Sequence, residues 1–128
     1  MLGNKHPDTA TTYNSIAGIH FRQGEFSEAL AWFQKSLYIR EEVLGQDHPD
    51  TATTLSDIAE VYFKQGDFQT ARETYCQSYL TRLCKLGKTN ELTLDTYDSM
   101  KSAHEHIDKG EPFDQWLEHC IDTYELPK

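Results

Sequence analysis

Apolar side chains recur every three or four positions in two successive stretches near the start of the chain. The first stripe contains Tyr13, Ile16, Ala17 and His20, and the second contains Phe26, Ala29, Leu30, Phe33 and Leu37. Each stripe has the spacing of one face of an α-helix. Gly24 lies between them, and glycine readily adopts the left-handed conformation that ends a helix. The pattern predicts two helices joined by a tight turn, with Pro7 at the start of the first.

The same pattern returns 42 residues later. The run His6–Thr12 is repeated as His48–Thr54, and Gln23–Phe26 returns as Gln65–Phe68 with Asp67 in place of Glu25. The matching stripes are Leu55, Ile58, Ala59 and Tyr62, followed by Phe68, Ala71, Tyr75 and Tyr79. A fixed period of this size is typical of proteins built from stacked helical repeats.

A third unit keeps Leu86-Gly87 in register with Leu44-Gly45 but departs from the pattern afterwards. Asn90-Glu91-Leu92 replaces His-Pro-Asp, and Gly110 comes two positions later than the period places a glycine. A helical stripe remains at Leu94, Tyr97, Met100 and Ile107. We therefore expect a degenerate repeat.

The last helix is expected to begin after Pro112 and to be strongly two-sided. Its apolar side contains Phe113, Trp116, Leu117, Cys120, Ile121 and Tyr124. Its other side contains Asp114, Glu118 and Asp122 and no Lys or Arg, which a helix lying on a membrane surface would need. This composition is typical of a helix that caps a stack.

Residues 1–128 are expected to form one domain with repeats at about 7–44, 49–86 and 90–126. The first helix has no cap before it, because Leu2-Gly3 corresponds to the end of a preceding helix pair. We therefore expect the chain to be a fragment of a longer array.

The repeated positions Ile16-Ala17, Gly24, Phe26, Ala29 and Phe33 resemble the tetratricopeptide repeat, a helix–turn–helix unit that usually has about 34 residues. The longer period, with Ile39-Arg40-Glu41 before Leu44-Gly45 and His48-Pro49, resembles the kinesin light chain subtype of that family. The resemblance covers about residues 1–83. It implies an all-α fold, a right-handed α-solenoid of three repeats whose first helices line a concave groove.

Composition and charge limit the kinds of partner that we expect the chain to bind and the cellular compartment in which we expect it. The formal net charge of −9 argues against nucleic acid or an anionic membrane as the partner. No apolar run approaches the roughly 20 residues needed to cross a bilayer, and the first residues, Met-Leu-Gly-Asn-Lys, contain no apolar stretch of the kind found in signal peptides. Cys76, Cys84 and Cys120 are odd in number and lack Cys-x-x-Cys spacing, so we expect reduced thiols and a cytoplasmic location.

Helical geometry places four positions of each first helix on one side, beginning one residue after Tyr13, Leu55 and Tyr97. These positions are Asn14, Gly18, Phe21 and Arg22, then Ser56, Glu60, Phe63 and Lys64, then Asp98, Ser102, Glu105 and His106. The aromatic rings are suited to anchor a peptide, the cations to bind an acidic residue, and Asn14 or Ser56 to bind peptide backbone. The residues expected to bind peptide are Asn14, Phe21, Arg22, Ser56, Glu60, Phe63 and Lys64. The family resemblance implies a peptide with an aromatic residue among acidic ones.

An alternative interpretation has no site at these positions. Phe21 and Phe63 would then pack against the adjoining repeat, and Arg22 and Lys64 would be ordinary exposed charges.

Metal, cofactor and catalytic sites are not expected. His104 and His106 are two positions apart, about 200° around a helix, so they cannot share an ion. His6 and His48 occupy equivalent positions at a helix start, which favours a structural role. The chain has no phosphate-binding glycine loop, nucleophile elbow or His-Glu-x-x-His motif.

We therefore expect a non-catalytic scaffold that binds a peptide segment of a partner protein in the groove. One alternative is self-association through the uncapped first helix, where Ile16 and Ile19 would be exposed. Another is a targeting domain attached to an upstream catalytic domain.

Overall fold

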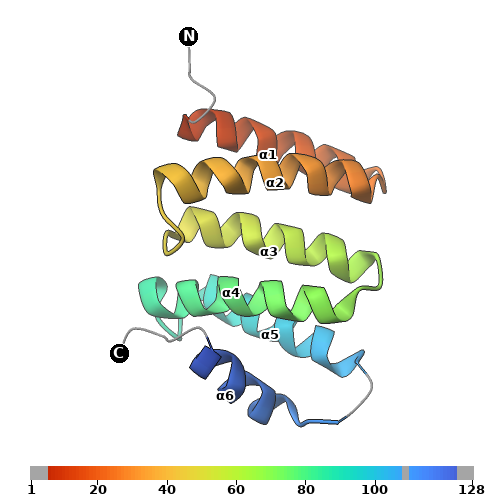
Figure 1. Ribbon diagram of the computed structural model, residues 1–128, viewed down its shortest axis with the longest axis vertical. Coiled ribbons are helices and arrows are strands. Elements are labelled where there is room, and N and C mark those ends of the chain that lie inside the picture. Colours follow the sequence, from red (N-terminus) through yellow and green to blue (C-terminus); the bar gives the residue numbers. More distant parts are fainter. Residues whose placement is uncertain (1–5, 108–109, 124–128) are drawn as a thin grey trace.

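The computed structural model describes residues 6–107 and 110–123, and these residues form six α-helices and no strands. The helices are α1 (Pro7–Arg22), α2 (Phe26–Val43), α3 (Pro49–Lys64), α4 (Phe68–Leu86), α5 (Glu91–Glu105) and α6 (Phe113–Thr123). They stack one after another along the longest axis of the molecule (Figure 1). The predicted fold class, an all-α solenoid of helix–turn–helix units, is confirmed.

The starts of α1, α3 and α5 have the same side-chain cap. His6, His48 and Asn90 each accept a hydrogen bond from the backbone N–H two residues later, over 3.0, 3.0 and 2.9 Å. An N-cap acceptor satisfies one of the backbone donors that a helix start leaves unpaired. The two histidines therefore have a structural role, and Asn90 fills the same role in the third unit.

Glycines in the left-handed region form the turn inside each of the first two helix pairs. Gly24 and Gly66 have φ values of 80° and 84°, a conformation that other residues adopt only with strain. The tight turn lets α1 pack on α2 and α3 on α4 with small residues between them. Ala17 and Ala29 are fully buried in the first pair.

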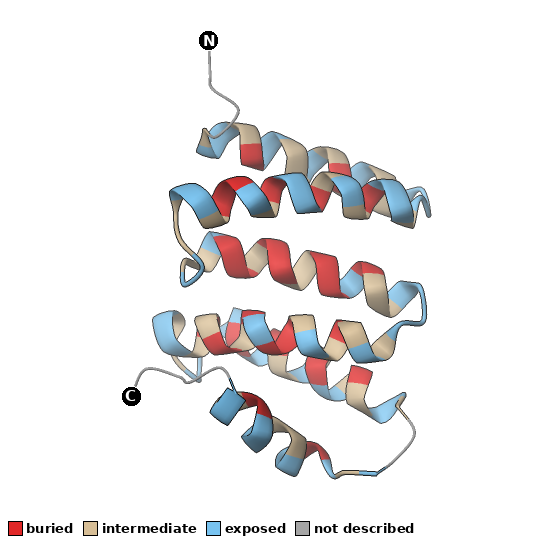
Figure 2. Cartoon of the chain, in the orientation of Figure 1, coloured by how far each residue is buried: buried red, intermediate tan, exposed pale blue. Residues whose placement is uncertain are grey.

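The core lies along the axis of the stack, between consecutive helices (Figure 2). One cluster joins the first pair to α3 and consists of Ala17, Ala29, Phe33, Ile58 and Val61. A second cluster joins α3, α4, α5 and α6 and consists of Ala59, Ala71, Tyr75, Cys76, Leu80, Met100, Ala103, Phe113 and Cys120. Each cluster draws residues from both repeat units it joins, so neither unit buries its apolar face alone.

Helix α6 covers the end of the stack with its apolar face. Phe113 and Cys120 are buried, whereas Asp114, Glu118 and Asp122 are exposed. Tyr124, which was expected on the apolar side, lies outside the described residues.

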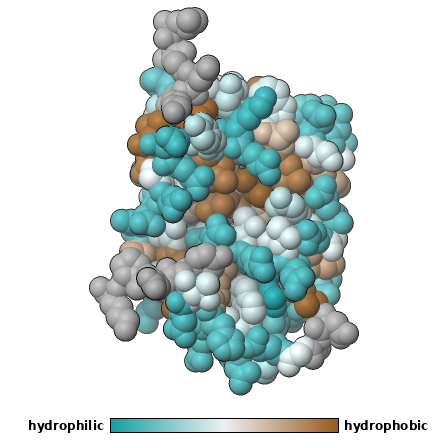
Figure 3. Space-filling view, viewed as in Figure 1, coloured by the Kyte–Doolittle hydropathy of each residue, from teal (hydrophilic) through white to brown (hydrophobic). Residues whose placement is uncertain are grey.

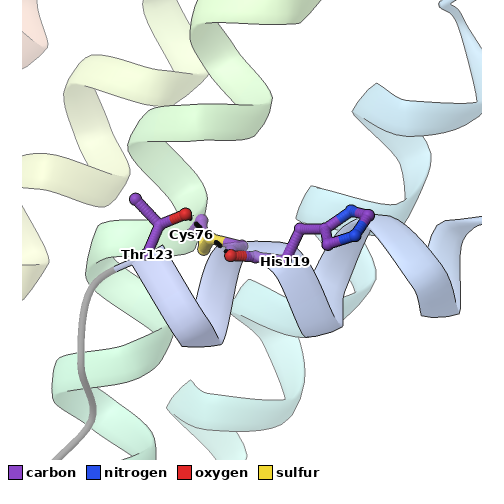
Figure 4. The surroundings of a disulfide bond; sticks show 4 residues. Cys76, His119 and Thr123 are labelled. Carbon is purple, nitrogen blue, oxygen red and sulfur yellow. Dashed lines mark hydrogen bonds between the residues drawn. A yellow bond between two sulfur atoms is a disulfide. The ribbon is translucent and has the colours of Figure 1, made fainter.

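Cys76 of α4 and Cys120 of α6 form a disulfide, next to His119 and Thr123 (Figure 4). The prediction of three reduced thiols is therefore wrong for these two, and only Cys84 is free. The two cysteines are 44 residues apart on helices that meet only when α6 folds back, so their spacing carried no sign of pairing. Disulfides persist mainly in oxidising compartments. The thiols therefore no longer support the expected cytoplasmic location, which stays a prediction.

Candidate functional site

Two buried arginines hold the first helices of neighbouring units in place. Arg40 of α2 donates to Thr54 Oγ1 over 2.7 Å and to the Asp50 carbonyl oxygen over 3.1 Å, both at the N-terminal half of α3. Arg82 of α4 repeats this arrangement on α5, through Thr96 Oγ1 at 2.7 Å. The guanidinium groups therefore set how each first helix sits against the preceding unit.

Sequence reasoning did not assign this role to the arginines, although a signal was present. Arg40 continues the apolar stripe of Phe33 and Leu37 at helical spacing, and Arg82 continues that of Tyr75 and Tyr79. A charged residue on a buried stripe requires hydrogen-bond partners, so the spacing alone could have indicated a buried network.

A cavity of about 260 Å³ lies between α1 and α3. It is lined by Asn14, Gly18, Phe21 and Arg22 of α1, Phe33 of α2, and Asp57 and Glu60 of α3. Four of the seven residues expected to bind peptide therefore surround one cavity. Pockets for drug-sized ligands have volumes of about 300–1,000 Å³, so this cavity has the size for a single side chain.

Gly18 leaves the space that the cavity occupies. A Cβ atom at this position would have Arg22 Nη1, at 3.8 Å, as its nearest neighbour outside the helix backbone. The equivalent positions of the second and third units are Glu60 and Ser102, which carry side chains. The cavity is thus a feature of the first unit and its junction with the second.

The carboxylate of Asp57 faces this cavity and was not among the expected residues. Asn14 Nδ2 donates a hydrogen bond to Asp57 Oδ2 over 3.1 Å. Burial raises the pKa of Asp57 from 3.8 to about 6, against the hydrogen bond from Asn14, which lowers it, while the charge of nearby Glu60 raises it further. The cavity therefore contains a carboxylate in a poorly solvated position.

Both the nitrogen and the oxygen of the Asn14 side-chain amide form hydrogen bonds within the protein. Besides its bond to Asp57, its Oδ1 accepts a hydrogen bond from Thr54 Oγ1 over 3.2 Å. This fixes the amide orientation and leaves one Nδ2 hydrogen for a ligand. Asn14 therefore links the network around Arg40 to the cavity.

Ser56, Phe63 and Lys64 do not line this cavity. The Phe63 ring packs edge-on against Phe68, at 5.0 Å between centroids, and against His106, at 5.2 Å. Lys64 is exposed at the end of α3 and Ser56 is half-buried. The two Phe–cation pairs that look equivalent in sequence thus have different surroundings, and of these four residues Phe21 and Arg22 alone line this cavity.

No described residue covers the face of α1 that points away from the stack. Val61 is fully buried in α3, whereas the equivalent residue of α1, Ile19, is 49% exposed. Thr54 is likewise buried and Thr12 exposed. The difference arises because α2 packs on α3, while none of the described residues packs on the same face of α1. In the view of Figure 3, apolar surface gathers at the level of α1 to α3 and hydrophilic surface dominates below it.

Among the residues that the structure describes there is neither a cluster of metal-binding side chains nor a helix that could span a membrane. No group of three or more of their His, Cys, Asp or Glu side chains is placed to hold a metal ion. None of the helices that they form is long and apolar enough to cross a membrane.

Comparisons with known proteins agree with this architecture. A sequence model of the tetratricopeptide repeat matches residues 2–79. Among solved structures, the chain is similar to the crystal structure of BtubC (BKLC) from P. vanneervenii, with a TM-score of 0.67 and 18% identity; the match covers 91% of this chain and 54% of that one. At this identity the similarity shows the fold alone, and no curated protein matches the sequence. Since the repeat model matches more than half of the chain, the protein belongs to the tetratricopeptide repeat family.

Proposed function

We propose that this chain is a non-catalytic module that binds a peptide segment of a partner protein along α1 and α3. Tetratricopeptide repeats are generally protein-interaction modules, and repeat stacks present extended binding surfaces. The observation that carries the proposal is the cavity of about 260 Å³ lined by Asn14, Phe21, Arg22 and Glu60. A side chain of the peptide would enter this cavity and contact the Phe21 ring.

The 42-residue spacing of the repeated runs supports a kinesin light chain-like subtype. On this basis we propose that the peptide carries an aromatic residue with acidic neighbours. Arg22 and Lys64 are both exposed at the C-terminal ends of α1 and α3, where an acidic side chain would reach them from solvent. The aromatic residue would pack beside Phe21.

Replacing the two cations Arg22 and Lys64 by glutamate should weaken binding of an acidic peptide. The probe is a labelled peptide with one tryptophan flanked by two glutamates on each side, and calorimetry measures its affinity. We expect the Arg22→Glu/Lys64→Glu protein to bind at least tenfold more weakly than the wild type, because two attractive contacts become repulsive. Lys85→Glu, an exposed change at the end of α4, is the matched control. If the charge-reversed protein binds the peptide with the affinity of the wild type, the peptide does not bind at Arg22 and Lys64 and the proposed groove is wrong.

A second function, self-association through α1, is favoured by the exposure of Ile19 beside half-buried Ile16. An uncovered helix face of this kind can be buried by a second copy of the chain. Analytical ultracentrifugation should show concentration-dependent association of the wild type and a monomer for Ile19→Glu. Leu94→Glu is the control, because Leu94 is exposed to a similar extent, 50%, on α5. A wild type that stays monomeric at high concentration excludes this function.

A further inference from the structure

The charges around the cavity between α1 and α3 are mostly negative. Asp57 and Glu60 of α3 line it together with a single cation, Arg22 of α1. Arg22 and Glu60 are both exposed, whereas Asp57 is partly buried. A ligand group that enters the cavity therefore meets the Asp57 carboxylate in the less solvated part, where charge interactions are stronger.

Asp57 has no cation of its own among the described residues. Its hydrogen bond comes from the neutral amide of Asn14, and no Lys or Arg nitrogen of those residues forms an ion pair with it. Arg40 and Arg82 are close enough to affect its pKa, but their guanidinium groups donate to threonine oxygens instead. Buried carboxylates are usually paired with a cation.

The shape of the cavity suits a long side chain with a charged end. Phe21 and Phe33 supply apolar surface for an aliphatic stem, and the absence of a side chain at Gly18 leaves room beside the Arg22 guanidinium, whose Nη1 lies 3.8 Å from the position a Cβ would occupy. Lys and Arg side chains characteristically bury their stems on apolar surface while the charged group finds a polar partner. The net charge of −9 also favours approach of a basic segment.

We propose that this cavity binds a basic side chain of the partner peptide, with its cation on the Asp57 carboxylate and its stem against Phe21 and Phe33. The inference rests on the proposed function and adds a residue class to it. The bound segment would carry a Lys or Arg near its aromatic residue, in addition to acidic residues near Arg22 and Lys64. Asp57 would then be the residue that selects the basic side chain.

The test is an NMR titration of the ¹⁵N-labelled protein with N-acetyl-arginine amide and with N-acetyl-citrulline amide, its neutral isostere. We expect the arginine compound to shift the amide signals of Gly18 and Asp57 with saturation, and the citrulline compound to bind at least tenfold more weakly. Gly18→Leu, which fills the cavity, and Asp57→Asn, which removes the charge, should both abolish saturable binding. Asp98→Asn is the matched control and should bind like the wild type, since it changes an exposed acid of α5.

Equal binding of the two compounds, or unchanged arginine binding in Asp57→Asn, would overturn the inference. The outcome is distinguishable from that of the groove proposal, because Lys64→Glu, which changes a residue outside the cavity, should weaken binding of the acidic tryptophan peptide but keep the arginine compound. If the acidic peptide binds and the arginine compound does not, the cation site is wrong and the groove stands. If only the arginine compound binds, the cation site stands and the acidic motif is wrong.

Discussion

Replacing Arg82 by alanine should lower the free energy of unfolding by about 3 kcal/mol, because hydrogen bonds to charged groups contribute roughly 1.5–3 kcal/mol each and are not additive. Arg82 is 5% exposed and donates to Thr96 Oγ1 over 2.7 Å and to Thr53 Oγ1 over 3.2 Å. Alanine would leave both hydroxyl groups without this donor and would open space where the arginine stem packs. Arg40→Ala should have a similar effect at the junction of α2 and α3, since its contacts are equivalent.

Urea unfolding followed by circular dichroism measures these changes, and two further variants separate their causes. Arg82→Lys should recover only part of the loss, because an ammonium group cannot reproduce the planar fork of a guanidinium. Arg22→Ala should change stability by less than about 0.5 kcal/mol, as expected for an exposed side chain. If Arg40→Ala and Arg82→Ala also fall in this small range, the arginines do not hold the repeats together.

The helices and their stacking could be predicted because the relevant signals are local and are repeated. Pro7 and Pro49 start helices, and Gly24 and Gly66 end them, each within a run that occurs twice. Because the same helix-starting and helix-ending residues occur at the same positions of two successive units, few folds other than a stack of repeats are compatible with the sequence. The side of α1 and α3 that forms the candidate site followed from the same periodicity.

Which residues line the cavity depends on how α1 and α3 pack against each other. The periodicity of the sequence does not specify this packing. Asp57 lies one position beyond Ser56 in the sequence and was assigned to no site, yet it faces the cavity while Ser56 does not. Phe63 was expected to act like Phe21, but His106 from the degenerate third unit packs against its ring. The pairing of Cys76 with Cys120 likewise depends on where α6 folds back. Each of these features is a contact between repeats that differ in sequence.

Replacing Asp57 by asparagine should raise the free energy of unfolding at pH 7 by about 1–3 kcal/mol, since one pKa unit corresponds to roughly 1.4 kcal/mol. Burial raises the pKa of Asp57 to about 6; Glu60 of α3 raises it further, while Asn14 of α1, Arg82 of α4 and Arg40 of α2 lower it. The folded protein therefore retains the Asp57 proton between about pH 4 and pH 6, where the unfolded chain has lost it. Over this range the contribution of Asp57 to stability falls as the pH rises.

Asparagine is neutral throughout, so the stability difference between Asp57→Asn and the wild type should be near zero at about pH 4 and reach its full size by about pH 7. Urea unfolding at several pH values measures it, and Asp98→Asn, an exposed change, should show little difference at any of them. A difference that does not vary with pH, or a less stable variant at pH 7, would contradict the assignment of the raised pKa to burial of a charge.

The same substitution links stability to the proposed binding. Residues that serve a binding site are often not the most stabilising choice at their position, and an ionised carboxylate lacking a cation partner is such a case. Asp57→Asn should therefore be more stable than the wild type and yet unable to bind N-acetyl-arginine amide. A loss of binding in a stabilised protein cannot result from unfolding, so it would assign the loss to the missing charge. If binding instead persists while stability rises, the charge of Asp57 only destabilises the protein, and the cavity has another occupant.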